Sequence, residues 1–214
     1  MASNPIKMKT VIGALLLIVA GEILAWSIFK MFQPPAMAVM GLTRLFQIVA
    51  MVWIITAAGG LRAIGLSAQT AGNGVYKGLL WSGGFGAAAA VGMGMLYFAG
   101  HHPLLLLRSP LPADPMGLAA FFLVGAVIAP VAEEMFFRGI LYTYFRRWGI
   151  LLALIGSTVI FVILHSVHGL PVIQIVGGIV FAAAYETSRN LMVPITLHML
   201  GNLALFTLSL PRFA

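Results

Sequence analysis

Long apolar stretches, separated by short polar or Gly- and Pro-rich breaks, dominate the pattern of the chain. A stretch of about 18 or more apolar residues is long enough to cross a membrane as a helix. Several stretches here approach or exceed that length, and the strict alternation of a barrel strand is absent from them. Because only helices and closed barrels satisfy every backbone polar group in lipid, the pattern predicts an all-α fold, a polytopic bundle of transmembrane helices.

The breaks between the apolar stretches divide the chain into about seven expected spans. The two longest breaks are residues 59–78, which are Gly-rich, and 100–115, which contain four prolines. Neither break is long enough for a separate soluble domain, and no internal repeat is visible, so residues 1–214 are expected to form a single integral membrane domain. The expected helices cover residues 10–30, 37–58, 79–99, 116–145, 151–167, 171–186 and 191–210.

Composition agrees with this pattern and limits the function. Of 214 residues, 61% are hydrophobic and 8% are charged, whereas a soluble domain has about 25% charged residues. The net charge of +7 comes from scattered basic residues rather than a basic stripe, so nucleic acid is not an expected partner and the lipid bilayer is. The chain contains no cysteine, which excludes disulfides, thiol catalysis and cysteine-bound metals.

The positions of Lys and Arg predict the orientation of the bundle. With the N-terminus in the cytoplasm, seven basic residues in loops and at helix ends fall on the cytoplasmic side and three fall outside, as the positive-inside rule requires. The expected topology therefore has a cytoplasmic N-terminus and an external C-terminus. The small size and very short loops indicate a prokaryotic protein of the inner (plasma) membrane.

The segment EEMFFRG raises the question of chemistry, because two of the five acidic residues of the chain stand together in an apolar stretch. Charged side chains at membrane depth are costly and mark functional sites. Glu134 and Arg138 are four residues apart and share a helix face, so they are expected to pair. Glu133 is rotated by about 100° from that face and is left for another role. Taken alone, an intrahelical Glu–Arg pair is more often structural.

Other polar residues are expected at a similar depth. Depth is counted from the cytoplasmic end of each expected helix, at 1.5 Å per residue. Glu133 and Asn202 then lie at a depth of ~18 Å, His165 at ~22 Å and His198 at ~12 Å. The hydrocarbon layer is about 30 Å thick. His198 and Asn202 are four residues apart and point the same way. Four costly polar groups from three helices in one layer indicate a single site.

Such a site has the groups for amide hydrolysis. Glu133 can activate a water, His165 can hold that water or protonate the leaving amine, and His198 and Asn202 can donate to the oxyanion. Alternatively, Glu133, His165 and His198 are a His₂Glu ligand set for zinc. The sequence does not separate these mechanisms, but a single Asp and the absence of H-E-x-x-H argue against an aspartyl dyad and a zincin.

Two functions of other classes also fit an intramembrane polar cluster. Chains of Glu, Arg and His form proton relays in proton-coupled transporters, although no repeat of the kind many transporters have is visible here. A non-catalytic scaffold or immunity protein is the other alternative.

The three polar segments resemble the signature of the CPBP family, the intramembrane proteases that include CAAX prenyl endopeptidases and bacteriocin-processing proteins of the Ras-converting type. That signature is E-E-x-x-x-R, then F-x-x-x-H, then H-x-x-x-N. The resemblance covers residues 116–205, the expected catalytic core. The matching segments are EEMFFR at 133–138, FVILH at 161–165 and HMLGN at 198–202.

The resemblance implies an intramembrane endopeptidase whose catalytic carboxylate is Glu133, with His165 beside it and His198 and Asn202 completing the pocket. It favours a glutamate mechanism that requires no cofactor, with zinc held by Glu133, His165 and His198 as the alternative. It also implies a substrate that is a membrane-anchored or tail-tagged protein or peptide. The supporting residues of the same segments are Glu134, Arg138 and Phe161.

Three further residues are notable for their place in the membrane. Glu22 in the first expected helix and Arg44 in the second lie at about the same depth, ~18 Å from the cytoplasmic ends. They are expected to pair, which would explain how both are tolerated in lipid; alternatively, Glu22 lines the substrate cavity. His168 is expected near the outer rim of the site, hydrogen-bonded locally rather than binding a metal.

Overall fold

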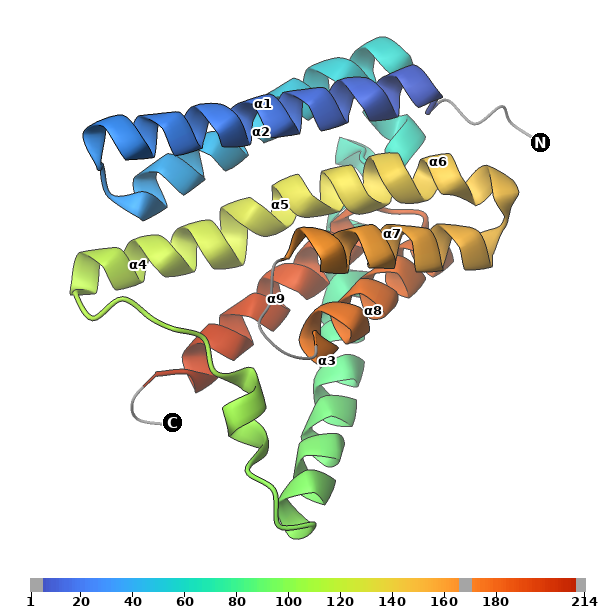
Figure 1. The fold of residues 1–214 in the computed structure, drawn as a ribbon. Helices are drawn as coiled ribbons and strands as arrows, with labels where there is room; N and C mark the ends of the chain where they lie inside the picture. The colour runs from blue at the N-terminus through green and yellow to red at the C-terminus, as the bar shows by residue number, and fades with distance from the viewer. Residues whose placement is uncertain (1–5, 166–170, 211–214) are drawn as a thin grey trace.

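The computed structural model describes residues 6–165 and 171–210, and every regular element among them is helical. Two long helices, α1 (Met8–Phe32) and α2 (Ala36–Ala58), form an antiparallel hairpin. Its tight turn includes Gln33 in the left-handed conformation, with φ 46°. Figure 1 shows this hairpin lying along one side of the molecule.

The third long helix, α3 (Ala68–Phe98), begins earlier than expected. It follows a short 3₁₀ turn, η1 (Leu61–Ile64), and precedes another, η2 (Pro103–Leu107). The expectation that residues 68–78 belong to a break is therefore wrong. Its glycines serve helix packing instead, because a Cβ on Gly74 would lie 2.5 Å from Asn190 Oδ1 and one on Gly78 would lie 2.6 Å from Thr196 Cβ.

Residues 115–148 form one continuous helical rod that contains two π-helical segments. Asp114 caps its start, since the Asp114 Oδ1 atom accepts from the Gly117 N–H at 2.6 Å, and the proline at the first helical position lacks an N–H that would need a partner. The segments are α4 (Pro115–Leu123), η3 (Val124–Ile128, π), α5 (Ala129–Glu134), η4 (Met135–Tyr142, π), α6 (Thr143–Phe145) and η5 (Arg146–Trp148, 3₁₀).

Three shorter helices complete the bundle: α7 (Ile150–Leu164), α8 (Val172–Ser188) and α9 (Met192–Leu208). The seven expected spans thus all correspond to helices. Four helical stretches are long and apolar enough to cross a membrane, namely α1, α2, residues 61–98 and the rod, whereas α7, α8 and α9 have 15 to 17 residues. The all-α membrane helical bundle predicted from the sequence is confirmed.

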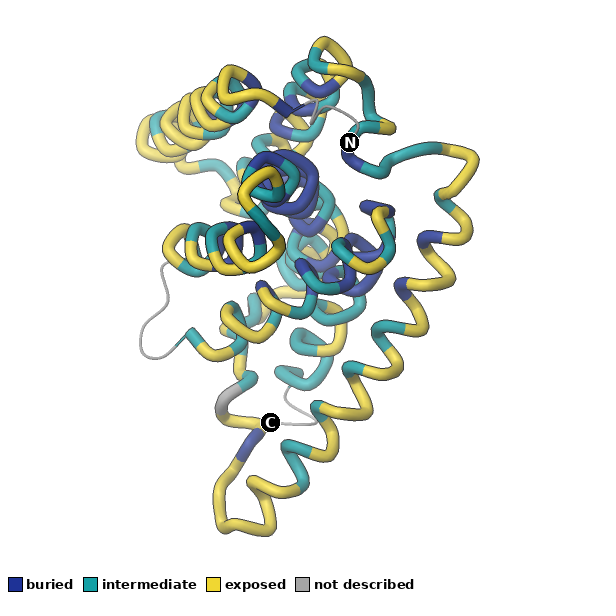
Figure 2. The backbone as a smooth tube through the Cα atoms, turned by 90° about the vertical axis from the view of Figure 1, so that its right-hand side faces the viewer, coloured by how far each residue is buried: buried dark blue, intermediate teal, exposed yellow. Residues whose placement is uncertain are grey.

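The rod is the centre of the bundle. In Figure 1, α5 and α6 run between the α1–α2 hairpin and the group of α7, α8 and α9, and α3 projects past the rest of the molecule. Figure 2 shows that buried residues gather along the rod, while α1 and most of α3 are exposed. All eight residues of η4 are buried, so the segment that carries EEMFFRG is surrounded by other helices.

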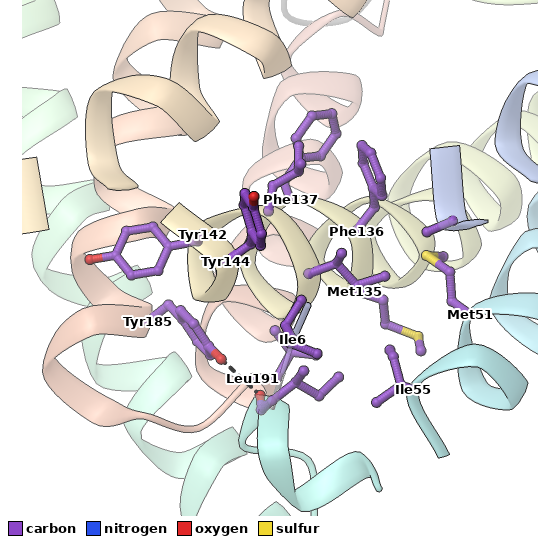
Figure 3. Close-up of a cluster of buried hydrophobic side chains, with 14 of the residues drawn as sticks. Ile6, Met51, Ile55, Met135, Phe136, Phe137, Tyr142, Tyr144, Tyr185 and Leu191 are labelled. Carbon is purple, nitrogen blue, oxygen red and sulfur yellow. Dashed lines mark hydrogen bonds between the residues drawn. The ribbon is translucent and has the colours of Figure 1, made fainter. Parts of the chain in front are cut away.

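Side chains from distant parts of the chain hold the rod in place. Figure 3 shows Met51 and Ile55 of α2 beside Met135 of the rod. On the other side, the Tyr185 ring of α8 packs edge-on against the Tyr142 ring of the rod, with the centroids 5.6 Å apart. These contacts come from helices before and after the rod in the chain, so the position of the rod is fixed from both sides.

An ionic cluster connects the C-terminal end of the rod to α8. The Tyr142 hydroxyl donates to Glu186 Oε2 at 2.7 Å, and the Arg146 guanidinium contacts the same carboxylate at 3.1 Å. Arg189 adds a third donor to Glu186 at 2.6 Å. This cluster sets the register between the rod and α8, and therefore which residues of α8 face the polar segment of the rod.

Candidate active site

The predicted pair of Glu134 and Arg138 is present in the centre of the bundle. Arg138 Nη1 donates to Glu134 Oε1 at 2.7 Å, and both side chains are fully buried. The Arg138 Nη2 atom donates to the Gly178 carbonyl of α8 at 3.0 Å. Three aromatic rings also surround the guanidinium, each with its centroid 5.1 to 5.9 Å from the Arg138 Cζ atom, and such rings stabilise a cation. These are Phe137, Phe161 and Phe181.

His198 of α9 is oriented by the same carboxylate. Its Nδ1 atom lies 2.8 Å from Glu134 Oε1, and its ring stacks on Phe181 with the centroids 4.6 Å apart. An ionised carboxylate only accepts hydrogen bonds, so the proton of this contact is on Nδ1. In neutral His198 the Nε2 atom then carries a lone pair, and it faces Glu133.

His165 is oriented by the backbone of its own helix. It is the residue that follows the last turn of α7, and its Nδ1 atom lies 2.7 Å from the Phe161 carbonyl oxygen. A carbonyl only accepts, so Nδ1 is again the protonated nitrogen. The ring of His165 packs against the Phe161 ring at 4.1 Å. The expected helix over residues 151–167 therefore ends at Leu164, and its end places His165 Nε2 toward Glu133.

Glu133 lies where the two histidines converge. Its Oε2 atom is 3.6 Å from His165 Nε2 and 3.8 Å from His198 Nε2. Both separations are too long for a direct hydrogen bond and suit groups bridged by a water. The side chains of Glu133 and His165 are 20% and 29% exposed, whereas that of His198 is 5% exposed. The cluster is thus reachable from one side and closed on the other.

Asn202, expected in the same pocket, makes a different contact. It lies one turn beyond His198 on α9, and its Nδ2 atom donates to the Gly125 carbonyl at 2.9 Å. Gly125 belongs to the π-helical η3, which leads into the polar segment of the rod. No hydrogen bond joins Asn202 to Glu133, His165 or His198 in the described parts of the chain. In this arrangement Asn202 fixes α9 against the rod.

The donor types at Glu133, His165 and His198 are those of a His₂Glu zinc site. However, residues 6–165 and 171–210 contain no group of three or more His, Asp or Glu side chains arranged to hold a metal ion. The 3.6 and 3.8 Å separations are close to the ~3.3–3.6 Å edge of a tetrahedron built with zinc-ligand bonds of about 2.0–2.2 Å. The zinc alternative stays a prediction. His168 lies outside the described residues.

Three contributors to the site were not singled out from the sequence. Phe181 stacks on His198, and the carbonyls of Gly178 and Gly125 accept hydrogen bonds from Arg138 and Asn202. Gly178 had a signal, because a glycine inside an apolar helix commonly has a packing reason; here a Cβ would lie 2.7 Å from Thr158 Cγ2. Nothing in the sequence distinguishes Phe181 from its apolar neighbours.

Comparison with protein families identifies the part of the chain that contains this cluster. Residues 115–204 match the family described as type II CAAX prenyl endopeptidase Rce1-like. This segment is Rce1-like. The match begins at the first residue of the rod and includes Glu133, His165, His198 and Asn202, and it confirms the resemblance to the CPBP proteases. Helices α1, α2 and α3 lie outside the Rce1-like segment. No curated protein and no solved structure matches the chain.

Proposed function

We propose that this integral membrane protein is an intramembrane endopeptidase. It hydrolyses a peptide bond of a membrane-associated protein or peptide, using a water activated by Glu133 and two histidines. The Rce1-like family is a family of prenyl endopeptidases, which supports peptidase activity. The observation that carries the mechanism is the convergence of Glu133 Oε2 with the Nε2 atoms of His165 and His198 at 3.6 and 3.8 Å.

The contacts of the two histidines favour a water beside Glu133. With both Nδ1 atoms protonated, His165, His198 and an ionised Glu133 present three acceptors to one another. A water has two protons to donate and can satisfy two of these acceptors. It is then held next to the base that takes its proton, as general base catalysis requires.

The reaction follows from this placement. The carboxylate of Glu133 takes one proton from the water while the water oxygen bonds to the carbonyl carbon, and the carbonyl π electrons move to the oxygen to give an oxyanion. When the oxyanion collapses, the C–N bond breaks and its electron pair stays on nitrogen. That nitrogen receives the proton that Glu133 took, directly or through His165. The products are a carboxylic acid and an amine.

Stabilisation of the oxyanion falls to His198 and Asn202. Because His198 Nδ1 donates to Glu134, His198 Nε2 donates to an oxyanion only after it has received from Glu133 the proton that the water gave up, and it returns this proton to Glu133 when the oxyanion collapses. The contact with Glu134 stabilises the charge of the protonated ring. Asn202 already uses one amide N–H on the Gly125 carbonyl, which leaves its second N–H for this role. The proposed mechanism uses water and protein groups without a metal.

The first prediction concerns the three converging side chains. Glu133→Gln, His165→Ala and His198→Ala should each reduce cleavage by about 10²- to 10⁴-fold, the usual contribution of a general acid or base. The measurement is a comparison of new peptide termini in membranes of cells that express the wild-type protein or each variant. His102→Ala is the matched control, because His102 is exposed in the segment between α3 and the rod, and it should cleave like the wild type.

Full cleavage by Glu133→Gln would show that the carboxylate is not the base. Cleavage by all variants alike would favour a scaffold or transporter whose apparent products come from another protease. Metal analysis of the purified active protein tests the zinc alternative: activity lost to a chelator and restored by zinc would replace the metal-free mechanism with one in which Glu133, His165 and His198 are ligands.

A further inference from the structure

A second polar cluster lies on the α1–α2 hairpin, outside the Rce1-like segment. Arg44 Nη1 donates to Glu22 Oε1 at 2.5 Å and to Gln47 Oε1 at 2.7 Å. The Gln47 Nε2 atom donates to the same Glu22 oxygen at 3.0 Å. The predicted pair of Glu22 and Arg44 is thus present, but the Glu22 side chain is 50% exposed and that of Arg44 is 24% exposed. Unlike the Glu134–Arg138 pair, this pair is open on one side.

The guanidinium of Arg44 is incompletely used. Its described hydrogen bonds all come from Nη1, and its Nε atom is buried without a partner. An unpaired buried N–H is destabilising, and more so in a charged group. The edge of a guanidinium formed by Nε and Nη2 matches the two oxygens of a carboxylate. Because Nε is buried, an incoming anion reaches this guanidinium first through Nη2, which makes no described hydrogen bond.

A cavity of about 240 Å³ lies in front of this cluster. Glu22 and Arg44 provide its polar wall, and Trp26, Phe29, Val39 and Met40 provide apolar walls. One cation beside an aromatic and aliphatic surface suits a ligand that joins a negative group to an apolar chain.

The hairpin that holds this cluster packs on the rod that carries Glu133. One contact between α2 and the rod is at Gly41, where a Cβ would lie 3.0 Å from Val124 Cγ2. Arg44 follows Gly41 by about one turn of α2, on the same stretch of the helix. A ligand held by Arg44 would therefore lie on the hairpin that packs against the rod, in a cavity whose walls come from α1 and α2.

We propose that Arg44 binds a carboxylate of the peptide substrate and that Glu22 occupies Arg44 until that carboxylate arrives. This inference rests on the proposed function, because it assigns the ligand of Arg44 to the molecule that is cleaved. Arg44 lies ~12 Å along α2 from its outer end, below the level of lipid phosphates. A carboxylate carried on an apolar peptide reaches this depth, so a peptide is favoured over a lipid headgroup.

Binding to the full chain in lipid nanodiscs tests this assignment without cleavage. The protein carries Glu133→Gln, and the discs contain neutral phosphatidylcholine. The probes are two fluorescent apolar hexapeptides of one sequence, one ending in a free carboxylate and the other in an amide. Fluorescence anisotropy, with the signal of empty discs subtracted, gives the Kd of each. We expect the acid to bind about tenfold more tightly than the amide, as a charge-assisted hydrogen bond predicts.

Variants of the pair give the decisive comparison. Arg44→Gln combined with Glu22→Gln removes both charges together and should reduce the acid-to-amide ratio to about one. Glu22→Gln alone should tighten acid binding, because the internal competitor is gone. Arg108→Gln, in the exposed segment after η2, is the matched control and should leave the ratio unchanged. The thermal unfolding midpoint of each variant in the same discs establishes that it is folded.

Three results would overturn the inference: no measurable binding of the acid peptide, equal binding of acid and amide, or selectivity that persists in the double variant. The discs are also prepared with phosphatidylglycerol, an anionic lipid. If this lipid abolishes the preference for the acid peptide and raises the unfolding midpoint only when Arg44 is present, Arg44 binds lipid instead. Because Glu133→Gln does not need to cleave, a failed proteolysis assay leaves this test intact. Lost selectivity in a protein that still cleaves would overturn the inference about Arg44 alone.

Discussion

At the scale of single residues, Glu134 has two partners on one oxygen. Its Oε1 atom accepts from Arg138 at 2.7 Å and from His198 at 2.8 Å, while its Oε2 atom is buried without a partner among the described residues. Glu134 thus neutralises a buried cation and also determines which nitrogen of His198 faces Glu133. The first of these effects concerns stability and the second concerns the geometry of the site.

Loss of Glu134 should therefore be costly. Glu134→Ala leaves the Arg138 guanidinium buried and unpaired, so we expect a loss of about 3–5 kcal/mol in the free energy of unfolding. Glu22→Ala is a comparison variant that breaks the half-exposed ion pair of the hairpin, and it should cost less, because Arg44 keeps Gln47 as a partner and is itself 24% exposed. Reversible denaturation in mixed micelles measures both. Equal losses in the two variants would contradict the distinction between the buried and the open pair.

The ion pairs were predictable from the sequence, but the contacts around them were not. Spacing of four residues was enough for Glu134 and Arg138, and equal depth was enough for Glu22 and Arg44. The stacking of Phe181 on His198 depends instead on how α8 is tilted and rotated against α9. Apolar helices carry little information about rotation in lipid, because most of their faces are alike.

At the scale of helices, the polar segment is not a regular α-helix. The expected helix over residues 116–145 contains π-helical turns at η3 and η4, and η4 begins directly after Glu134. The Thr143 hydroxyl donates to the Arg138 carbonyl, five residues earlier, at 3.1 Å. π-Helical turns are rare and occur frequently at functional sites. A wheel drawn at 100° per residue predicted the shared face of Glu134 and Arg138 but could not predict these wider turns.

Glycines of α3 divide into two groups with opposite expected effects. Gly78→Ala should destabilise the fold, because the new Cβ would lie 2.6 Å from Thr196 Cβ and 3.0 Å from the Val193 carbonyl oxygen; a loss of about 1–3 kcal/mol is usual for overpacking. Gly86→Ala is the matched control, since nothing lies within 4 Å of its Cβ position. It should gain up to about 1 kcal/mol from helix propensity.

Thermal unfolding midpoints of the two glycine variants, measured side by side in one detergent, check this contrast. A lower midpoint for Gly78→Ala and an unchanged or higher midpoint for Gly86→Ala are expected. If Gly78→Ala were as stable as Gly86→Ala, α3 and α9 would not approach each other as closely as the structure shows.

At the scale of the whole molecule, the order and number of the helices were predictable, whereas their lengths were predicted less well. Apolar stretches bounded by charge and proline identified the seven long helical stretches found among residues 6–165 and 171–210. The Gly-rich beginning of α3 was taken for a break, because a sequence does not show that α9 lies against Gly74 and Gly78. Two predictions stay untested by the structure: the single domain over residues 1–214 and the orientation in the membrane.

The orientation is testable because the chain has no cysteine of its own. We expect the start of α3 in the cytoplasm and its end outside, since 31 residues span ~46 Å, more than the hydrocarbon thickness of about 30 Å. Single cysteines at Ala68 and His101, both exposed, report the two ends. In intact cells a membrane-impermeant maleimide should label His101→Cys and should label Ala68→Cys only after lysis. Labelling of both positions in intact cells would contradict this topology.

The origin of the site in three separate helices has a consequence for biosynthesis. Glu133 and Glu134 leave the ribosome well before His198, which belongs to α9. Until α9 has inserted, Glu134 lacks the imidazole that shares its oxygen, and Glu133 faces at most one histidine. Under the proposed mechanism, a nascent chain with α1 to α8 already in the bilayer is therefore inert toward its neighbours, and the capacity to cut arises in a single late event, the docking of α9.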